Sequence, residues 1–155
     1  MQIKEKSQLK QKILRYIKNK LGVNHTKVGD MPICPYIQQY KNAITVVESD
    51  DPEQIVKNFI VFRDIFKLEA VVVYGFDWEY DDLADELDYL NKKYRRKDIE
   101  CLGMHPDTEQ TPLPVEYTFR DTPLIIIQRR STLLKARKEL AKTTKYYKYF
   151  KEPAK

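Results

Sequence analysis

The first residues able to do chemistry are the consecutive Cys34, Pro35 and Tyr36. Pro35 fixes a backbone angle that suits the first position of a helix, so Cys34 is predicted to cap a short helix that ends near Tyr40. The unpaired N–H groups at such a helix start favour the thiolate, which is the nucleophilic form of cysteine. The structural alternative is a buried cysteine that packs as a small apolar side chain.

A redox role is a further alternative for Cys34, because cysteine followed by proline and tyrosine also resembles the redox motif of glutaredoxins. That motif has a second cysteine where this chain has Ile37, and a strand leads into it. The residues from Gly29 to Ile33 show no strand pattern. The sequence therefore favours a nucleophile over a redox pair.

A second candidate group is His105-Pro106-Asp107, which directly follows the predicted strand Ile99–Met104. Ligands of parallel sheets bind where strands end, because loops and helix starts converge there. A histidine at this edge can exchange protons near neutral pH, and Asp107 could orient its ring. The alternative is a structural turn in which both side chains cap backbone groups.

A third candidate is Arg120, which precedes Asp121, Thr122 and Pro123. Thr122 as cap and Pro123 as first residue predict that a helix starts here and runs through Leu124 and Ile127. A guanidinium beside a helix start makes a site for a carboxylate or a phosphate. The alternative is a surface arginine that pairs with Asp121.

These groups together suggest a cysteine-centred active site in an enzyme, a hydrolase or a transferase that acts on a small anionic molecule. Cys34 is the predicted nucleophile, His105 the acid and base, and Asp107 the residue that orients His105. Arg120 is predicted to bind the anion. Tyr36 and Thr122 complete the predicted substrate-binding residues, and neither a metal nor a cofactor is expected.

The three motifs resemble, in the same order, those of the bacterial family catalogued as domain of unknown function 1415. Members of that family have a Cys-Pro-Phe-like turn, a Phe-His-Pro-Asp-like turn and a Tyr-Thr-x-Arg-Ser-Pro-like segment before a helix. The likeness covers about residues 20 to 141. Here Met104 replaces the aromatic residue before the histidine, and the segment 108–116 is shorter. The resemblance implies that the motifs form one site, and it implies no reaction.

A metal site is the weaker interpretation of the same residues. Cys34, Cys101, His105 and Asp107 are all ligand types, but four residues of extended chain put Cys101 and His105 about 13 Å apart. The acidic run that starts at Asp77 lacks the central glycine of a calcium-binding loop. Neither a zinc nor a calcium site is expected.

Alternating strand and helix patterns indicate the elements that position these residues. Predicted strands lie at Ile44–Val47, Ala70–Tyr74 and Ile99–Met104. Predicted helices are an amphipathic one over 1–21, a well buried one that begins at Pro52 and extends to Phe66, one that ends near Arg96, and the last one after Thr122. This order predicts an α/β fold with a small, mostly parallel sheet of about three strands and helices packed around it.

The charge distribution supports a rival function. The chain has 28 Lys and Arg against 23 Asp and Glu, a net charge of +5. Residues 1–20 and 128–155 carry the whole excess, so the middle is acidic. If the two basic terminal helices pack side by side, the protein could be a non-catalytic module that binds nucleic acid weakly, helped by the basic and aromatic tail 142–155. The alternative is a lysine-rich surface that only confers solubility.

Composition excludes several classes of protein. The length of 155 residues and the apolar share of 42% fit a single domain, 1–155. No apolar run approaches the roughly 20 residues that cross a bilayer, so no membrane partner is expected. Two cysteines are too few for a disulfide scaffold, and no secretory signal is recognised, which favours a cytoplasmic protein. The sequence leaves the oligomeric state open.

Overall fold

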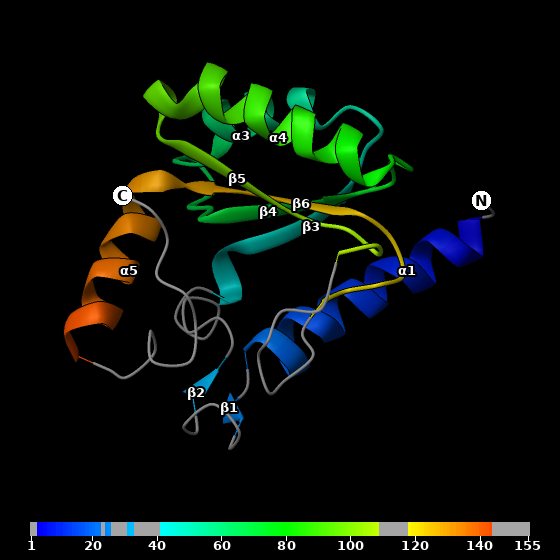
Figure 1. Cartoon of the computed structure of the whole chain (residues 1–155), viewed down its shortest axis with the longest axis horizontal. Coiled ribbons are helices and arrows are strands. Elements are labelled where there is room, and N and C mark those ends of the chain that lie inside the picture. The colour runs from blue at the N-terminus through cyan, green and yellow to red at the C-terminus, as the bar shows by residue number, and fades with distance from the viewer. Residues whose placement is uncertain (1–2, 23, 26–30, 33–40, 109–117, 144–155) are drawn as a thin grey trace.

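The structure is a computed structural model that describes residues 3–22, 24–25, 31–32, 41–108 and 118–143. It has an α/β fold, as predicted, in which a four-stranded sheet lies between helices (Figure 1). The residues Cys34 and Tyr36, the helix predicted for 34–40 and most of the basic tail lie outside the described part. The site is therefore built below from the other candidate residues.

The sheet contains β3 (Ile44–Glu48), β4 (Ala70–Tyr74), β6 (Leu124–Arg129) and β5 (Ile99–Met104), in that order. β3 and β4 are parallel, whereas β6 is antiparallel to both of its neighbours. The prediction of three mostly parallel strands was therefore wrong in the number and pairing of strands. β3, β4 and β5 still run in the same direction, because β6 lies between β4 and β5 and is antiparallel to both.

The fourth strand replaces the first part of the predicted last helix. Leu124 to Ile127 includes three consecutive isoleucines, and β-branched side chains favour strands. A short run of apolar residues that is fully buried has the same sequence pattern in a strand and in a helix. The spacing of its apolar residues therefore could not distinguish the two. The helix, α5 (Arg130–Thr143), starts seven residues later than predicted.

α3 (Pro52–Phe62) and α4 (Tyr80–Tyr94) cover one face of the sheet (Figure 1). Asp51 caps α3 by accepting a hydrogen bond from the N–H of Gln54. A 3₁₀ turn over Arg95–Lys97 extends α4, close to the predicted end near Arg96. The core on this face consists of apolar side chains from both helices and the sheet, among them Val56, Phe59, Leu83, Leu90, Val71, Val73, Ile99, Ile125 and Ile127.

α1 (Ile3–Tyr16) crosses the opposite face of the sheet and continues as a π-helical turn over Ile17–Leu21 (Figure 1). Ile13 is fully buried there against a second apolar cluster that includes Val46, Val72, Tyr74, Phe119 and Leu124. A short antiparallel pair, β1 (Asn24–His25) and β2 (Met31–Pro32), follows in a region predicted to be a loop. α5 leaves the other end of the sheet, so the two basic helices do not pack side by side.

The end of α3 departs from its prediction. The apolar pattern predicted a buried helix as far as Phe66, but α3 ends at Phe62. Val61, Phe62, Ile65 and Phe66 are between 44% and 70% exposed. The pattern is apolar on more than one side of the helix, and the sheet covers only one of these sides.

Among the described residues, no helix combines the length and the hydropathy that crossing a membrane would require.

Candidate functional site

The candidate site lies at the sheet edge where β3, β4 and β5 end and β6 begins. Glu48 is paired with Tyr74, and Met104 with Leu124, so these four strand ends share one edge. Gly75 ends β4 with φ of +102°, and an added Cβ there would lie 3.2 Å from the backbone N of Ser49. This edge brings the residues after β5 close to those before β6.

His105 is buried at this edge, with 5% of its surface exposed, and both of its ring nitrogens are bonded. Nδ1 accepts a hydrogen bond from the N–H of Asp107 at 3.0 Å, so this nitrogen carries no proton. The proton of the neutral ring is therefore on Nε2, which donates to the carbonyl oxygen of Trp78 at 2.7 Å. The edge of the Tyr80 ring packs against His105, with ring centroids 5.7 Å apart.

The residues after His105 form a closed turn. The N–H of Thr108 donates to the carbonyl of His105 at 3.0 Å, and Oγ1 of Thr108 accepts from the N–H of His105. The Asp107 carboxylate is 3.9 Å from Nδ1 of His105 and 73% exposed, too far for a hydrogen bond. The backbone of Asp107, rather than its carboxylate, therefore orients the ring.

Arg120 joins the segment before β6 to this turn. Its Nη1 donates to the carbonyl of Pro106 at 2.7 Å and to that of Thr108 at 2.9 Å. The structure thus brings Arg120 and the His105 turn together, although more than ten residues separate them in the chain. These bonds fix the guanidinium, which carries a permanent positive charge, at the outer side of the turn.

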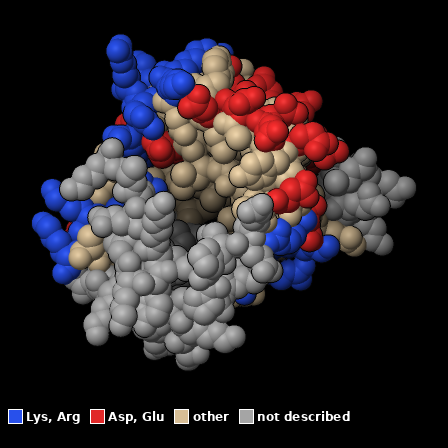
Figure 2. All heavy atoms as spheres, viewed as in Figure 1, with Lys and Arg blue, Asp and Glu red and all other residues tan. Residues whose placement is uncertain are grey.

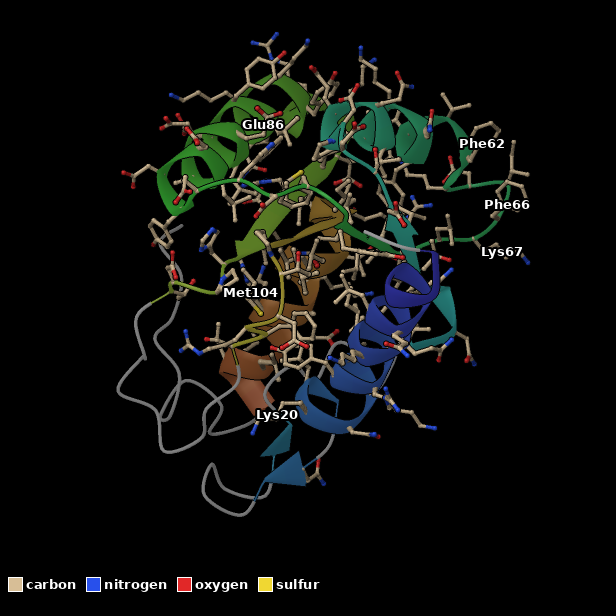
Figure 3. All side chains as sticks on the ribbon, turned by 90° about the vertical axis from the view of Figure 1, so that its right-hand side faces the viewer. Lys20, Phe62, Phe66, Lys67, Glu86 and Met104 are labelled. Carbon is tan, nitrogen blue, oxygen red and sulfur yellow. The ribbon has the colours of Figure 1, made fainter. Side chains whose placement is uncertain are left out.

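Met104 anchors the end of β5 (Figure 3). Its sulfur accepts hydrogen bonds from the hydroxyl of Tyr16 at 3.3 Å and from the N–H of Phe119 at 3.1 Å. The rings of Tyr16 and Phe119 are in contact, with centroids 5.2 Å apart. Met104 therefore connects α1 to the segment that carries Arg120.

A hollow of about 450 Å³ opens at the same edge of the sheet, between the ends of β3 and β4 and the start of β6. Thr122, one of the predicted substrate-binding residues, lines it. Glu48, Asp77 and Asp121 also line it, and Asp121 pairs with Lys12 at 3.3 Å. With Asp121 paired to Lys12, Glu48 and Asp77 still disfavour an anion, so the anion predicted from the sequence fits the Arg120 side of the edge better than this hollow.

Cys101 lies outside the site, and its buried thiol is not expected to react. It is 1% exposed in the core beneath α4, and burial raises the pKa of its thiol to about 12. Its backbone is fixed by Asn91, whose Oδ1 accepts from the N–H of Cys101 and whose Nδ2 donates to its carbonyl. Within the described ranges, no group of three or more His, Cys, Asp or Glu is placed to hold a metal ion.

Several contacts that build the site carried no recognisable sequence signal. The carbonyl of Trp78 holds the His105 ring, and any residue type offers a carbonyl. The Tyr16 contact with Met104 joins residues 88 positions apart, and only the packing of α1 on the sheet creates it. Of these contacts, the one made by the Thr108 hydroxyl could have been predicted, because a threonine three residues after His105 is typical of a turn in which the hydroxyl bonds to the backbone.

Comparison of the chain with protein-family models, with curated proteins and with solved structures gave no match. The resemblance to the domain of unknown function 1415 therefore stays a prediction that rests on the three motifs.

Proposed function

We propose that this protein is a cysteine-dependent hydrolase or transferase that acts on a small anionic substrate at the edge where β5 ends. The observation that carries the proposal is the contact of Arg120 with the turn after His105. Two motifs whose side chains could take part in binding or catalysis, distant in the chain, meet there and are held together by hydrogen bonds. Arg120 supplies the positive charge that an anionic substrate needs.

Cys34 is the nucleophile in this proposal. The helix start predicted after Pro35 favours its thiolate, which attacks the electrophilic carbon of the substrate and forms a carbon–sulfur bond as the bond to the leaving group breaks. The leaving group takes a proton from water. Water then releases the product in a hydrolase, and a second nucleophile does so in a transferase. The thiol proton passes to solvent as the thiolate forms.

The hydrogen bonds change the role proposed for His105. An acid and base must have a ring nitrogen that can reach the reacting group, and both nitrogens of His105 are already bonded to the backbone. In this proposal His105 is a positioning residue, which holds the turn that presents the Pro106 and Thr108 carbonyls to Arg120. Asp107 contributes its N–H to the same turn.

Alkylation by iodoacetamide tests the nucleophile. We expect Cys34 to react well below pH 8, since a thiolate at a helix start forms at lower pH than a free thiol. We expect Cys101 to stay unmodified in the folded protein, since burial raises the pKa of its thiol to about 12. Mass spectrometry of the two cysteine peptides over a pH series measures both rates.

The control is the same reaction in denaturant, where both cysteines should be modified at similar rates. A Cys34→Ser variant should show no rapid modification at all. Equal, slow modification of Cys34 and Cys101 in the folded chain would contradict the proposal.

A further inference from the structure

A second surface lies at the opposite end of the sheet, where β5 begins and β6 ends. Three segments meet there, the turn 63–68 after α3, the 3₁₀ turn 95–97 and the β6–α5 junction. Arg63 connects the first two by donating to the carbonyls of Lys97 at 2.8 Å and Asp98 at 3.3 Å. The Asp98 carboxylate accepts from the N–H and the hydroxyl of Ser131 at the start of α5. This network makes the end one fixed surface.

The surface carries four large apolar side chains that are exposed. Val61 is 62% exposed, Phe62 44%, Ile65 70% and Phe66 65%. The Phe62 and Phe66 rings are neighbours, with centroids 5.9 Å apart. Both point outward on the same side as Lys67 (Figure 3). Four such side chains within six residues form a contiguous apolar patch rather than scattered exposure.

Exposed cations lie on α3, on the turn 63–68 and on the 3₁₀ turn 95–97. Lys57, Lys67, Arg96 and Lys97 are exposed, and the ion pairs among the described residues include none of them. Basic side chains gather over the end of α4 that leads into the 3₁₀ turn, whereas acidic side chains cover the start of α4 (Figure 2).

The carboxylates near the patch already have partners. Asp64 pairs with Arg129 at 2.7 Å, and Glu100 lies 3.4 Å from Arg130. Asp98 binds the neutral Ser131 and keeps its charge, but cations outnumber the carboxylates in these segments. The charge that remains around the two phenylalanine rings is positive.

We propose that this end binds single-stranded nucleic acid, with bases stacked on Phe62 and Phe66 and phosphates beside the surrounding cations. Exposed aromatic rings beside unpaired lysines and arginines match a chain that alternates flat bases with negative charges. This inference goes beyond the proposed enzyme function and does not depend on it. It also places the nucleic-acid surface away from the terminal helices on which the sequence placed it.

Charge argues against two other occupants. A second copy of the chain would bring Lys57, Lys67, Arg96 and Lys97 against their own counterparts across a twofold contact. A bilayer would take up the apolar tip together with Asp64, whose carboxylate lies in the same turn and is 82% exposed. A strand of nucleic acid stacks on the rings and leaves Asp64 in water.

The test is fluorescence anisotropy with a labelled twelve-nucleotide oligo(dT) and the full chain. We expect micromolar binding that weakens as salt rises, and a loss of about tenfold or more in the Phe62→Ala, Phe66→Ala double variant. Lys67→Glu with Lys97→Glu should weaken binding and reduce the salt dependence. Leu102→Ala, at another exposed apolar residue, and Lys10→Glu with Lys18→Glu, which changes the charge equally on α1 and the π-helical turn that continues it, are the matched controls and should bind like the wild type.

NMR chemical shifts of the wild-type chain on addition of the oligonucleotide give a readout that does not depend on variants. Changes centred on residues 57–67 and 95–97 are expected. Absence of binding, equal loss in the control variants, equal affinity for heparin, or shifts confined to α1 would each overturn the proposal. Binding to phosphatidylserine vesicles in place of the oligonucleotide, or self-association through the phenylalanines without oligonucleotide binding, would do so too.

Discussion

Replacing His105 with alanine is expected to lower the free energy of unfolding by about 3 kcal/mol, one of the two largest effects that the structure predicts. The substitution leaves the Trp78 carbonyl without its donor and the Asp107 N–H without its acceptor, and it empties the space beside Tyr80. Denaturant unfolding at neutral pH, followed by circular dichroism, measures the loss.

Two further variants separate the contributions to this loss. His105→Asn is expected to lose less than alanine, because its side-chain oxygen can accept from the Asp107 N–H in the same way as Nδ1. Asp107→Asn should change stability by less than about 0.5 kcal/mol, because that carboxylate is exposed and makes no hydrogen bond to the ring. If His105→Ala is as stable as the wild type, the ring does not hold the turn.

The second large effect concerns Glu53, which joins the start of α3 to the end of α4. Its carboxylate accepts hydrogen bonds from the hydroxyls of Tyr94 at 2.7 Å and Tyr89 at 3.0 Å, and from Nζ of Lys93 at 2.9 Å. The Tyr94 hydroxyl, followed by Lys93, lowers the pKa of Glu53 from 4.5 to about 2. Glu53→Gln is therefore expected to lower the free energy of unfolding at pH 7 by about 2 kcal/mol.

The pH dependence of stability checks the same contact. Because the pKa of Glu53 is lower in the folded than in the unfolded chain, its contribution is fully present above pH 4.5. That contribution decreases as the pH falls from 4.5 toward 2. The wild type should lose its advantage over Glu53→Gln across this interval, as urea unfolding at several pH values can measure. An advantage that stays constant down to pH 2 would contradict the lowered pKa.

The sequence was sufficient to predict those elements whose patterns are local. Pro52 after an acidic cap placed the start of α3, and the continuous apolar run Ala70–Tyr74 placed β4. Leu124 to Ile127 was assigned to a helix because Thr122 and Pro123 resemble a helix start and a short buried run has no distinctive period. The antiparallel insertion of β6 between β4 and β5 depends on long-range pairing, which one sequence does not reveal.

The candidate site likewise combines features that local sequence patterns predict with features that depend on long-range contacts. The edge position of His105 followed from its place after a strand, and β5 does run in the same direction as β4. The pairing of Arg120 with backbone carbonyls was not predictable, because its partners Pro106 and Thr108 offer only main-chain oxygens. The exposure of Phe62 and Phe66 depends on where the sheet ends beneath α3, which the apolar pattern of the helix does not contain.

The central claim is that Cys34 lies in one site with the turn after His105. The most direct measurement is a short bismaleimide cross-link between Cys34 and a cysteine introduced by Asp107→Cys, where the native side chain is 73% exposed. Asp88→Cys, on α4 and equally accessible with 66% exposure, is the matched control. Mass spectrometry of the digested protein is expected to show the cross-linked peptides for Asp107→Cys and none for Asp88→Cys. No cross-link from position 107, or equal yields from both positions, would contradict a shared site.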